Sequence, residues 1–247
     1  NLGSDGASVL TGKYNGVFAK LKAKISHLIH FHCVCHKGQL AASSIFEAVP
    51  FCGKLDELLK SVLNNYSHST QKRDELEELC IANDDPAGKL GHFSFTRWLA
   101  RGMGYDVILT KIDSIIEQHH SAKSDNEVSR GIYQKLTDGM YFIGLCHVSD
   151  VLHRFNALNR LCQATYLDGC TLKTTVDALI TSLRVFEGKT DEDAWLFMGP
   201  NVMRLVEDHS FTFQDGEITN FRYGTDPGWT IRWDSARCKR FITFARE

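Results

Sequence analysis

The sequence has 247 residues, of which 43% are apolar and 23% are charged, and its formal net charge is −2. A chain of this size and composition can bury one substantial core or two modest ones, and four prolines and nineteen glycines argue against long disordered tracts. The near-neutral charge excludes a protein that attracts nucleic acid over its whole surface. The lack of an 18-residue apolar run argues against a membrane span.

The charge is unevenly distributed along the chain. Residues 1–40 contain five lysines and one aspartate, a net +4, whereas residues 56–85 contain eight acids and three basic residues, a net −5. We therefore expect only one face of the molecule to meet a polyanion such as DNA. The eight cysteines are too widely spaced for a small disulfide scaffold, and we interpret them as buried free thiols of a reducing compartment.

The first fifty residues alternate between helical and extended patterns. Apolar residues four apart predict a helix over 13–25, with lysines on its other side. Residues 27–34 (HLIHFHCV) predict a short strand, buried on at least one face. A second helix is predicted over 36–49, where Pro50 stops it. The order of loop, helix, strand and helix indicates an α/β segment.

From residue 51 onward the patterns are helical. They predict two helices within 148–186, on either side of a turn at Asp168–Gly169, and further helices over 53–69, 71–83, 96–121, 124–148 and the last fifteen residues. Residues 210–224 predict either a hairpin around Asp215–Gly216 or a loop between helices. We place a domain boundary near residue 50, between an α/β segment over 1–50 and an all-helical domain over 51–247.

Two stretches near the start of the chain contain candidate functional residues. Asp5 stands where an extended segment passes into a helix, a position typical of site residues at the carboxyl edge of a sheet, although an Asp-Gly pair is also typical of a turn. Cys33 and His36 have the two-residue gap of many zinc ligand pairs. No second well-spaced pair follows, so a strand end on which Cys33 packs is the alternative.

A third stretch, FTRWLARG, places Arg97 and Trp98 at a predicted helix start, with Thr96 as a plausible N-cap. A helix N-terminus attracts phosphate, and an Arg–Trp pair offers a charge for the DNA backbone and a ring for stacking an unpaired base. The alternative interpretation of Trp98 is a core aromatic. The sequence has no glycine-rich phosphate loop and no Gly-x-Ser-x-Gly elbow.

In combination, the stretches SDGASVLTGKYNGVFAKLK, HLIHFHCVCHKGQLAASS and TRWLARG resemble the hAT superfamily of cut-and-paste DNA transposases, especially the zinc-finger-type host proteins derived from them. This resemblance implies a ribonuclease-H-like catalytic domain that is interrupted by a large helical insertion domain. The expected fold class is therefore mainly α. Residues 1–50 would be a fragment of the ribonuclease-H-like α/β domain, and residues 51–247 the helical insertion domain.

The resemblance also implies roles for particular residues. Asp5 matches the second of three acids that bind Mg²⁺, a hard cation that carboxylate oxygens suit. Cys33 and His36 match a Cys-x-x-His signature. His36 would act as a catalytic residue at the scissile phosphate, and the pair is also the candidate Zn²⁺ site. DNA contacts are expected from Lys13 and from the two residues of the Arg-Trp motif, Arg97 and Trp98.

The other two acids of the set have no recognisable match in this sequence, which also lacks an initial methionine. We therefore expect an internal piece of a larger protein, which alone neither cuts nor joins DNA because two metal ions need converging acids. The resemblance further implies a nuclear location, DNA as partner and self-association through a region outside this sequence. Two alternatives stay open: a domesticated scaffold or regulator that binds DNA or proteins without catalysis, and a helical interaction domain with no role on nucleic acid.

Overall fold

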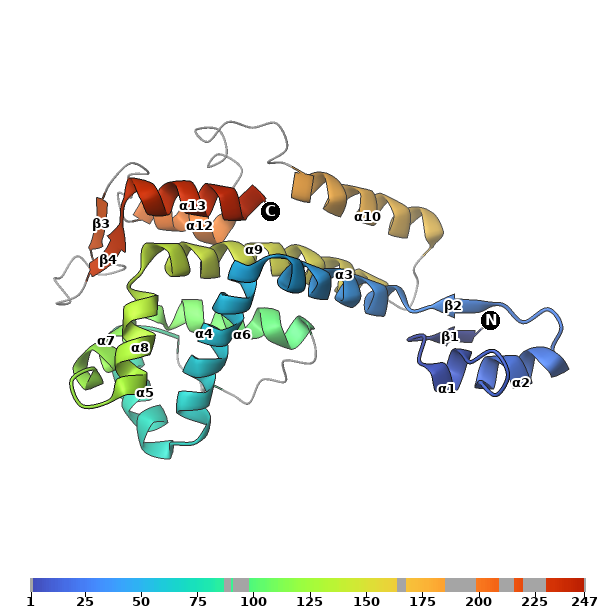
Figure 1. Ribbon diagram of the computed structural model, residues 1–247, viewed down its shortest axis with the longest axis horizontal. Helices are drawn as coiled ribbons and strands as arrows, with labels where there is room; N and C mark the ends of the chain where they lie inside the picture. The colour runs from blue at the N-terminus through green and yellow to red at the C-terminus, as the bar shows by residue number, and fades with distance from the viewer. Residues whose placement is uncertain are drawn as a thin grey trace.

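The computed structural model describes residues 2–86, 90, 98–163, 168–184, 199–208, 216–219 and 230–246, and within these it leaves out the side chains of 98–100, 205–208, 216–219 and 246. Over this part the chain is mainly helical, as the sequence predicts. Figure 1 shows a body of helices with a small α/β unit, residues 2–32, extending from one end. None of the described helices is both long enough and apolar enough to cross a membrane.

The α/β unit consists of β1 (Leu2–Ser4), α1 (Ser8–Thr11), α2 (Val17–Lys24) and β2 (His30–His32). The two strands pair in parallel, with Leu2 opposite His30 and Ser4 opposite His32. A parallel pair needs a crossover connection, and α1 and α2 supply it. Because both strands run in the same direction, their carboxyl ends meet at one edge, where the chain continues into Asp5 and Cys33.

Two predictions for this unit need correction. The helix predicted over 13–25 starts only at Val17, since residues 13–16 form a turn in which the Gly16 amide donates to the Gly12 carbonyl. The strand predicted over 27–34 is only three residues long. Neither of its faces is fully buried, because Phe31 on one face is 55% exposed and His30 and His32 on the other are half-buried.

The helical body is built around α9 (Gly139–Cys162), which is buried along most of its length. An α-helix with apolar and small residues on all sides is typical of the centre of a bundle. The helices that pack against α9 are α3 (Val34–Ala48), α4 (Pro50–Ser67), α6 (Trp98–Thr110), α8 (Glu127–Leu136), α10 (Gly169–Leu183), α12 (Pro200–Asp208) and α13 (Ser235–Arg246). Two further helices, α5 (Thr70–Ala82) and α7 (Ile112–Ala122), pack against each other, and α7 also packs against α8.

Two of the predicted long helices are each divided in the structure. The helix predicted over 96–121 breaks at Lys111, whose side chain is buried and whose ammonium group donates to the Pro86 carbonyl. The helix predicted over 124–148 breaks between α8 and α9, where the Thr137 carbonyl accepts the amide of Arg232 at 2.8 Å. Apolar spacing is helical on both sides of each break, so the pattern does not reveal contacts that come from distant segments.

The other helix boundaries agree better with the sequence. Pro50 ends α3 and also occupies the first turn of α4, where its missing N–H has no helical partner to lose. Asp168 caps α10 by accepting the Thr171 amide at 2.8 Å, so the predicted break at Asp168–Gly169 is confirmed. Asp234 likewise accepts the Arg237 amide at 2.8 Å at the start of α13, the predicted last helix.

A second small sheet lies beside α9 and α13. Its strands β3 (Gly216–Thr219) and β4 (Thr230–Trp233) pair antiparallel, with Gly216 opposite Trp233. Gly216 starts a strand whose partner lies farther along the chain. The rest of the predicted hairpin or loop over 210–224, including Asp215, lies outside the described residues, so that prediction stays untested. The domain boundary near residue 50 stays a prediction.

Candidate functional site

Asp5 directly follows β1, at the edge of the parallel pair. Its side chain is exposed, and its Oδ1 accepts a hydrogen bond from the Ala7 amide at 3.0 Å. Gly6 has a φ of +85°, a conformation that favours glycine. The resulting turn bends the chain from β1 toward α1 and leaves the Asp5 carboxylate at the strand edge, as the sequence predicts.

His32 and His36 form the other half of this edge. His32 is the last residue of β2, and His36 lies in the first turn of α3. Their rings stack with 5.8 Å between centroids and 19° between planes. The Nε2 atom of His32 is buried and has no hydrogen-bond partner among the described residues. Ser4, which is opposite His32 in the ladder, has its Oγ 2.7 Å from Nε2 of His30.

The structure brings the Asp5 segment and the Cys33–His36 segment to the same edge. The Cys33 amide donates to the Ser4 carbonyl at 2.7 Å, and the His32 ring packs against Gly6. Contacts therefore run without a gap from the Asp5 turn through His32 to His36. We call this group, Asp5, Gly6, His32 and His36, the strand-edge site.

The sequence predicted Asp5 and His36 but gave His32 no role. The structure shows that His32 is the residue that joins them, since it touches the turn after Asp5 and the ring of His36. The signal available in the sequence was the alternation of HFH, which places His30 and His32 on the same side of a strand. The partner, Gly6, lies 26 residues away from His32, so local spacing could not identify it.

Cys33 differs from its prediction. It occupies the N-cap position of α3 and is exposed, so the expectation that it packs at a buried strand end is wrong. Among the described residues, no group of three or more His, Cys, Asp or Glu side chains is arranged to hold a metal ion. Asp5 supplies one exposed carboxylate, which suits a single Mg²⁺ ligand. Both Mg²⁺ at Asp5 and Zn²⁺ at Cys33 and His36 stay predictions.

The three predicted DNA-contacting residues have different outcomes. Lys13 is exposed in the turn between α1 and α2, and its Nζ lies 5.4 Å from the centroid of the Tyr14 ring. Arg97 lies outside the described residues. Trp98 is the first residue of α6, which agrees with the predicted helix start, but its side chain is not among those described.

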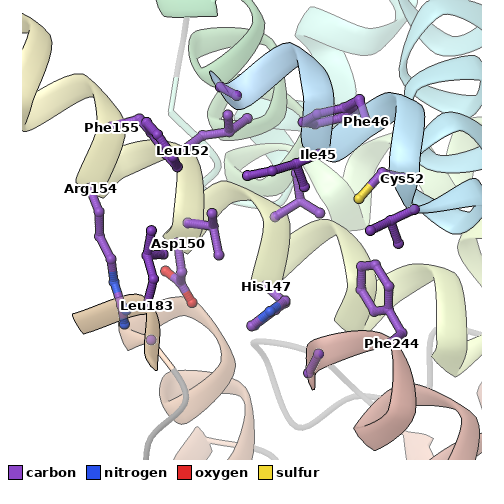
Figure 2. A pocket seen from close by; sticks show the side chains of 16 residues that line it. Ile45, Phe46, Cys52, His147, Asp150, Leu152, Arg154, Phe155, Leu183 and Phe244 are labelled. Carbon is purple, nitrogen blue, oxygen red and sulfur yellow. The ribbon is translucent and has the colours of Figure 1, made fainter. Parts of the chain in front are cut away.

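A cavity of about 180 Å³ lies inside the helical body, between α3, α9 and α13 (Figure 2). Most of its wall is apolar, and its polar side chains are His147, Asp150 and Arg154. Asp150 accepts the amides of Asn201 at 3.1 Å and of Val202 at 3.3 Å, so it holds the start of α12. Burial raises the pKa of Asp150 and lowers that of His147 to about 4.

Two of the polar side chains of this cavity, Asp150 and Arg154, hold neighbouring helices in place. The guanidinium of Arg154 donates to the Ser182 carbonyl of α10, as Asp150 accepts from α12. Of the candidate functional residues that the structure describes, Asp5, Lys13, Cys33 and His36 do not line the cavity. The cavity is therefore not part of the strand-edge site.

No protein-family model matches this chain, and no solved structure matches it. The family of the chain is not shown by these comparisons, and the resemblance to hAT transposases stays a prediction.

Proposed function

We propose that this chain is a fragment of a hAT-type transposase-like protein that binds DNA and that alone neither cuts nor joins it. The observation that carries the proposal is the strand-edge site. Asp5, His32 and His36 gather where the carboxyl ends of two parallel strands meet, which is the edge where open α/β sheets assemble their sites. The α/β unit would be part of a ribonuclease-H-like domain, and the helical body would be its insertion domain.

In this proposal Asp5 is a ligand of Mg²⁺, and the ion would polarise a DNA phosphate when it is bound. His36 donates a hydrogen bond to the same phosphate. Its ring is oriented for this role by stacking on His32, which is itself fixed by β2 and by Gly6. One carboxylate does not hold two ions, so cleavage requires the two further acids that the resemblance implies.

The charges of the α/β unit support DNA as the partner. Lys13 lies between α1 and α2, and Lys20 and Lys24 are one turn apart on α2; all three are exposed. Lys37 is exposed directly after His36. Lys22 differs, because its ammonium donates to the Leu28 carbonyl at 2.7 Å. Phosphates neutralised by such lysines release counterions, which makes the affinity dependent on salt.

A second candidate is a domesticated scaffold that binds a protein partner without catalysis. The observation in its favour is the acidic exposed surface of α5, where Asp74, Glu75 and Glu78 lie on the outside of the body. This surface would repel DNA and attract a basic protein segment.

The experiment that tests the proposal is a salt titration of DNA binding by fluorescence anisotropy. The dissociation constant of the wild-type chain for a labelled duplex should rise steeply with salt. Replacing Lys13, Lys20 or Lys24 by Gln should each reduce the logarithmic slope by about one. Matched controls are Lys60→Gln and Lys173→Gln, because these ammonium groups pair with Asp56 and Asp177 on the body. Absence of binding at low salt would contradict the proposal and favour the scaffold.

A further inference from the structure

Three cysteines meet where the α/β unit joins the helical body. Cys33 and Cys35 lie at the start of α3, and Cys162 is the last residue of α9. The Cys35 thiol donates to the Asn159 carbonyl of α9, with 3.8 Å between the two atoms. Asn159 and Cys162 are three residues apart, so they lie on the same face of that helix. The first turn of α3 therefore rests on the last turn of α9.

The thiol of Cys35 interacts with both of the other thiols of this cluster. It lies within hydrogen-bonding reach of Cys33 and of Cys162. Cys33 is exposed, whereas Cys35 and Cys162 are partly buried, and all three are free thiols. By contrast Cys52, Cys80 and Cys146 are buried in the body.

We propose that Cys35 and Cys162 are a modification site at which a hydroperoxide oxidises the two thiols to a disulfide. This proposal does not rest on the function proposed above. Both residues lie at the contact between the first turn of α3 and the last turn of α9, where the Cys35 thiol touches the Asn159 carbonyl one turn before Cys162, so the bond needs no separation of the two helices. The disulfide would connect the first turn of α3 directly to the end of α9.

The reaction proceeds in two balanced steps. The Cys162 sulfur attacks an oxygen of the peroxide. The O–O bond breaks, Cys162 becomes a sulfenic acid, and its thiol proton leaves with the departing oxygen as water or alcohol. The Cys35 sulfur then attacks the Cys162 sulfur, the S–O bond breaks, and the hydroxide leaves as water with the proton of Cys35. Two thiols lose two hydrogens, and the peroxide is reduced.

The slow partner in this reaction is Cys35. Burial raises the pKa of Cys35 to about 11, so its thiolate is scarce at neutral pH. Burial also raises the pKa of the Cys162 thiol.

The bond would restrain the part of the chain that contains the strand-edge site. Cys35 directly precedes His36, and β2 ends three residues before Cys35. Figure 1 shows that the α/β unit extends beyond the end of α3 and away from the bulk of the body. A covalent connection at this junction would reduce movement of the α/β unit relative to α9.

The test is a peptide map of the wild-type chain after treatment with hydrogen peroxide, alkylation and tryptic digestion without reduction. Residues 25–37 form one tryptic peptide with Cys33 and Cys35, and residues 161–173 form another with Cys162 and Cys170. We expect these two peptides to be joined, with a mass lower by two hydrogens than their sum, and to separate on reduction. Fragment spectra should place the bond between Cys35 and Cys162.

Four variants test the pairing independently. Cys33→Ser and Cys170→Ser should retain the joined peptides, whereas Cys35→Ser and Cys162→Ser should lose them. Circular dichroism of each variant checks that the loss is not due to unfolding, and the fragment spectra of the wild type do not depend on any variant. The proposal is overturned if the wild type gives only sulfinic acids, or if Cys35→Ser still forms the joined pair.

Discussion

His32 packs directly against Gly6: a Cβ atom built on Gly6 would lie 2.6 Å from Cε1 and 2.8 Å from Nε2 of the His32 ring. These distances leave no room for a side chain at position 6. The contact connects the turn after β1 with the last residue of β2, and it places Asp5 beside the His32–His36 stack. The geometry of the strand-edge site therefore depends on a glycine whose φ is +85°.

The first prediction concerns this glycine. Gly6→Ala should destabilise the α/β unit by about 1–3 kcal/mol, because alanine is strained at positive φ and its methyl group would displace His32. Hydrogen exchange of the β1 and β2 amides measures this loss, since it reports local opening of the unit. Gly3→Ala is the matched control, because a Cβ there meets no atom within 4 Å.

The steric part of this effect can be separated from the backbone part. In a His32→Ala background, Gly6→Ala should cost less, since only the strain of the positive φ remains. An equal cost in both backgrounds would show that the His32 ring moves away freely and does not determine the position of the turn.

The second prediction concerns Asp5. Asp5→Asn should leave the fold unchanged, because the amide oxygen can still accept the Ala7 amide and the side chain is exposed. If the proposed function holds, a protein that combines this chain with the two further acids should lose Mg²⁺-dependent DNA cleavage on the same change, since it removes a charged ligand. Asp177→Asn, on the exposed face of α10, is the control. Cleavage at the wild-type rate by Asp5→Asn would remove Asp5 from the metal ligands.

The third prediction concerns Asp150, which accepts backbone amides at the start of α12. Asp150→Ala should lower the free energy of unfolding by about 1–3 kcal/mol, because two amides in a buried place lose their acceptor. Urea unfolding measures the loss. Asp177→Ala should change stability by less than about 0.5 kcal/mol, because its partner Lys173 is on the surface. Similar losses in both variants would show that the contact with α12 contributes little.

The fourth prediction is a pH dependence that comes from two buried histidines. Burial lowers the pKa of His119 and of His147 to about 4, from an ordinary value of 6.5. As pH falls below 6.5, the unfolded chain binds protons at these positions and the folded chain does not, so stability is retained above this window and is lost toward pH 4. The full difference corresponds to about 3 kcal/mol for each histidine.

Urea unfolding at several pH values tests this dependence. Between about pH 7 and about pH 4.5, His119→Gln should lose about 2 kcal/mol less stability than the wild type, and His147→Gln should behave alike. His68→Gln is the control, because His68 is exposed at the end of α4. If all three variants follow the wild-type curve, then the buried histidines do not determine the acid sensitivity.

The sequence predicted those features that depend on neighbours along the chain. The mainly helical character after residue 50, the break at Asp168–Gly169 and the position of Asp5 after an extended segment are local, and all three agree with the structure, although β3 and β4 show that residues 51–247 are not all helical. The break at Lys111 and the bridge from Thr137 to Arg232 depend on distant segments that take up backbone or ammonium hydrogen bonds. The spacing of apolar residues within a single helix does not indicate such long-range hydrogen bonds.

The candidate site shows the same division. Asp5 and His36 could be predicted from the sequence because each belongs to a short motif: Asp5 to an Asp-Gly pair, and His36 to a Cys-x-x-His spacing. The contact between Gly6 and His32 joins residues 26 positions apart. The contact between Cys35 and Asn159, near the end of α9, joins residues 124 positions apart. Only the parallel register of β1 with β2 and the packing of α3 on α9 bring those residues together.

The most direct test of the central claim is a hydrogen-exchange footprint of the chain with and without duplex DNA at low salt. Our account predicts slower exchange in peptides that cover residues 7–24 and 32–37, where the exposed lysines and His36 lie, and unchanged exchange over α5. Protection over α5, or no protection anywhere at DNA concentrations that saturate non-specific binding, would contradict a DNA-binding role for the strand-edge site.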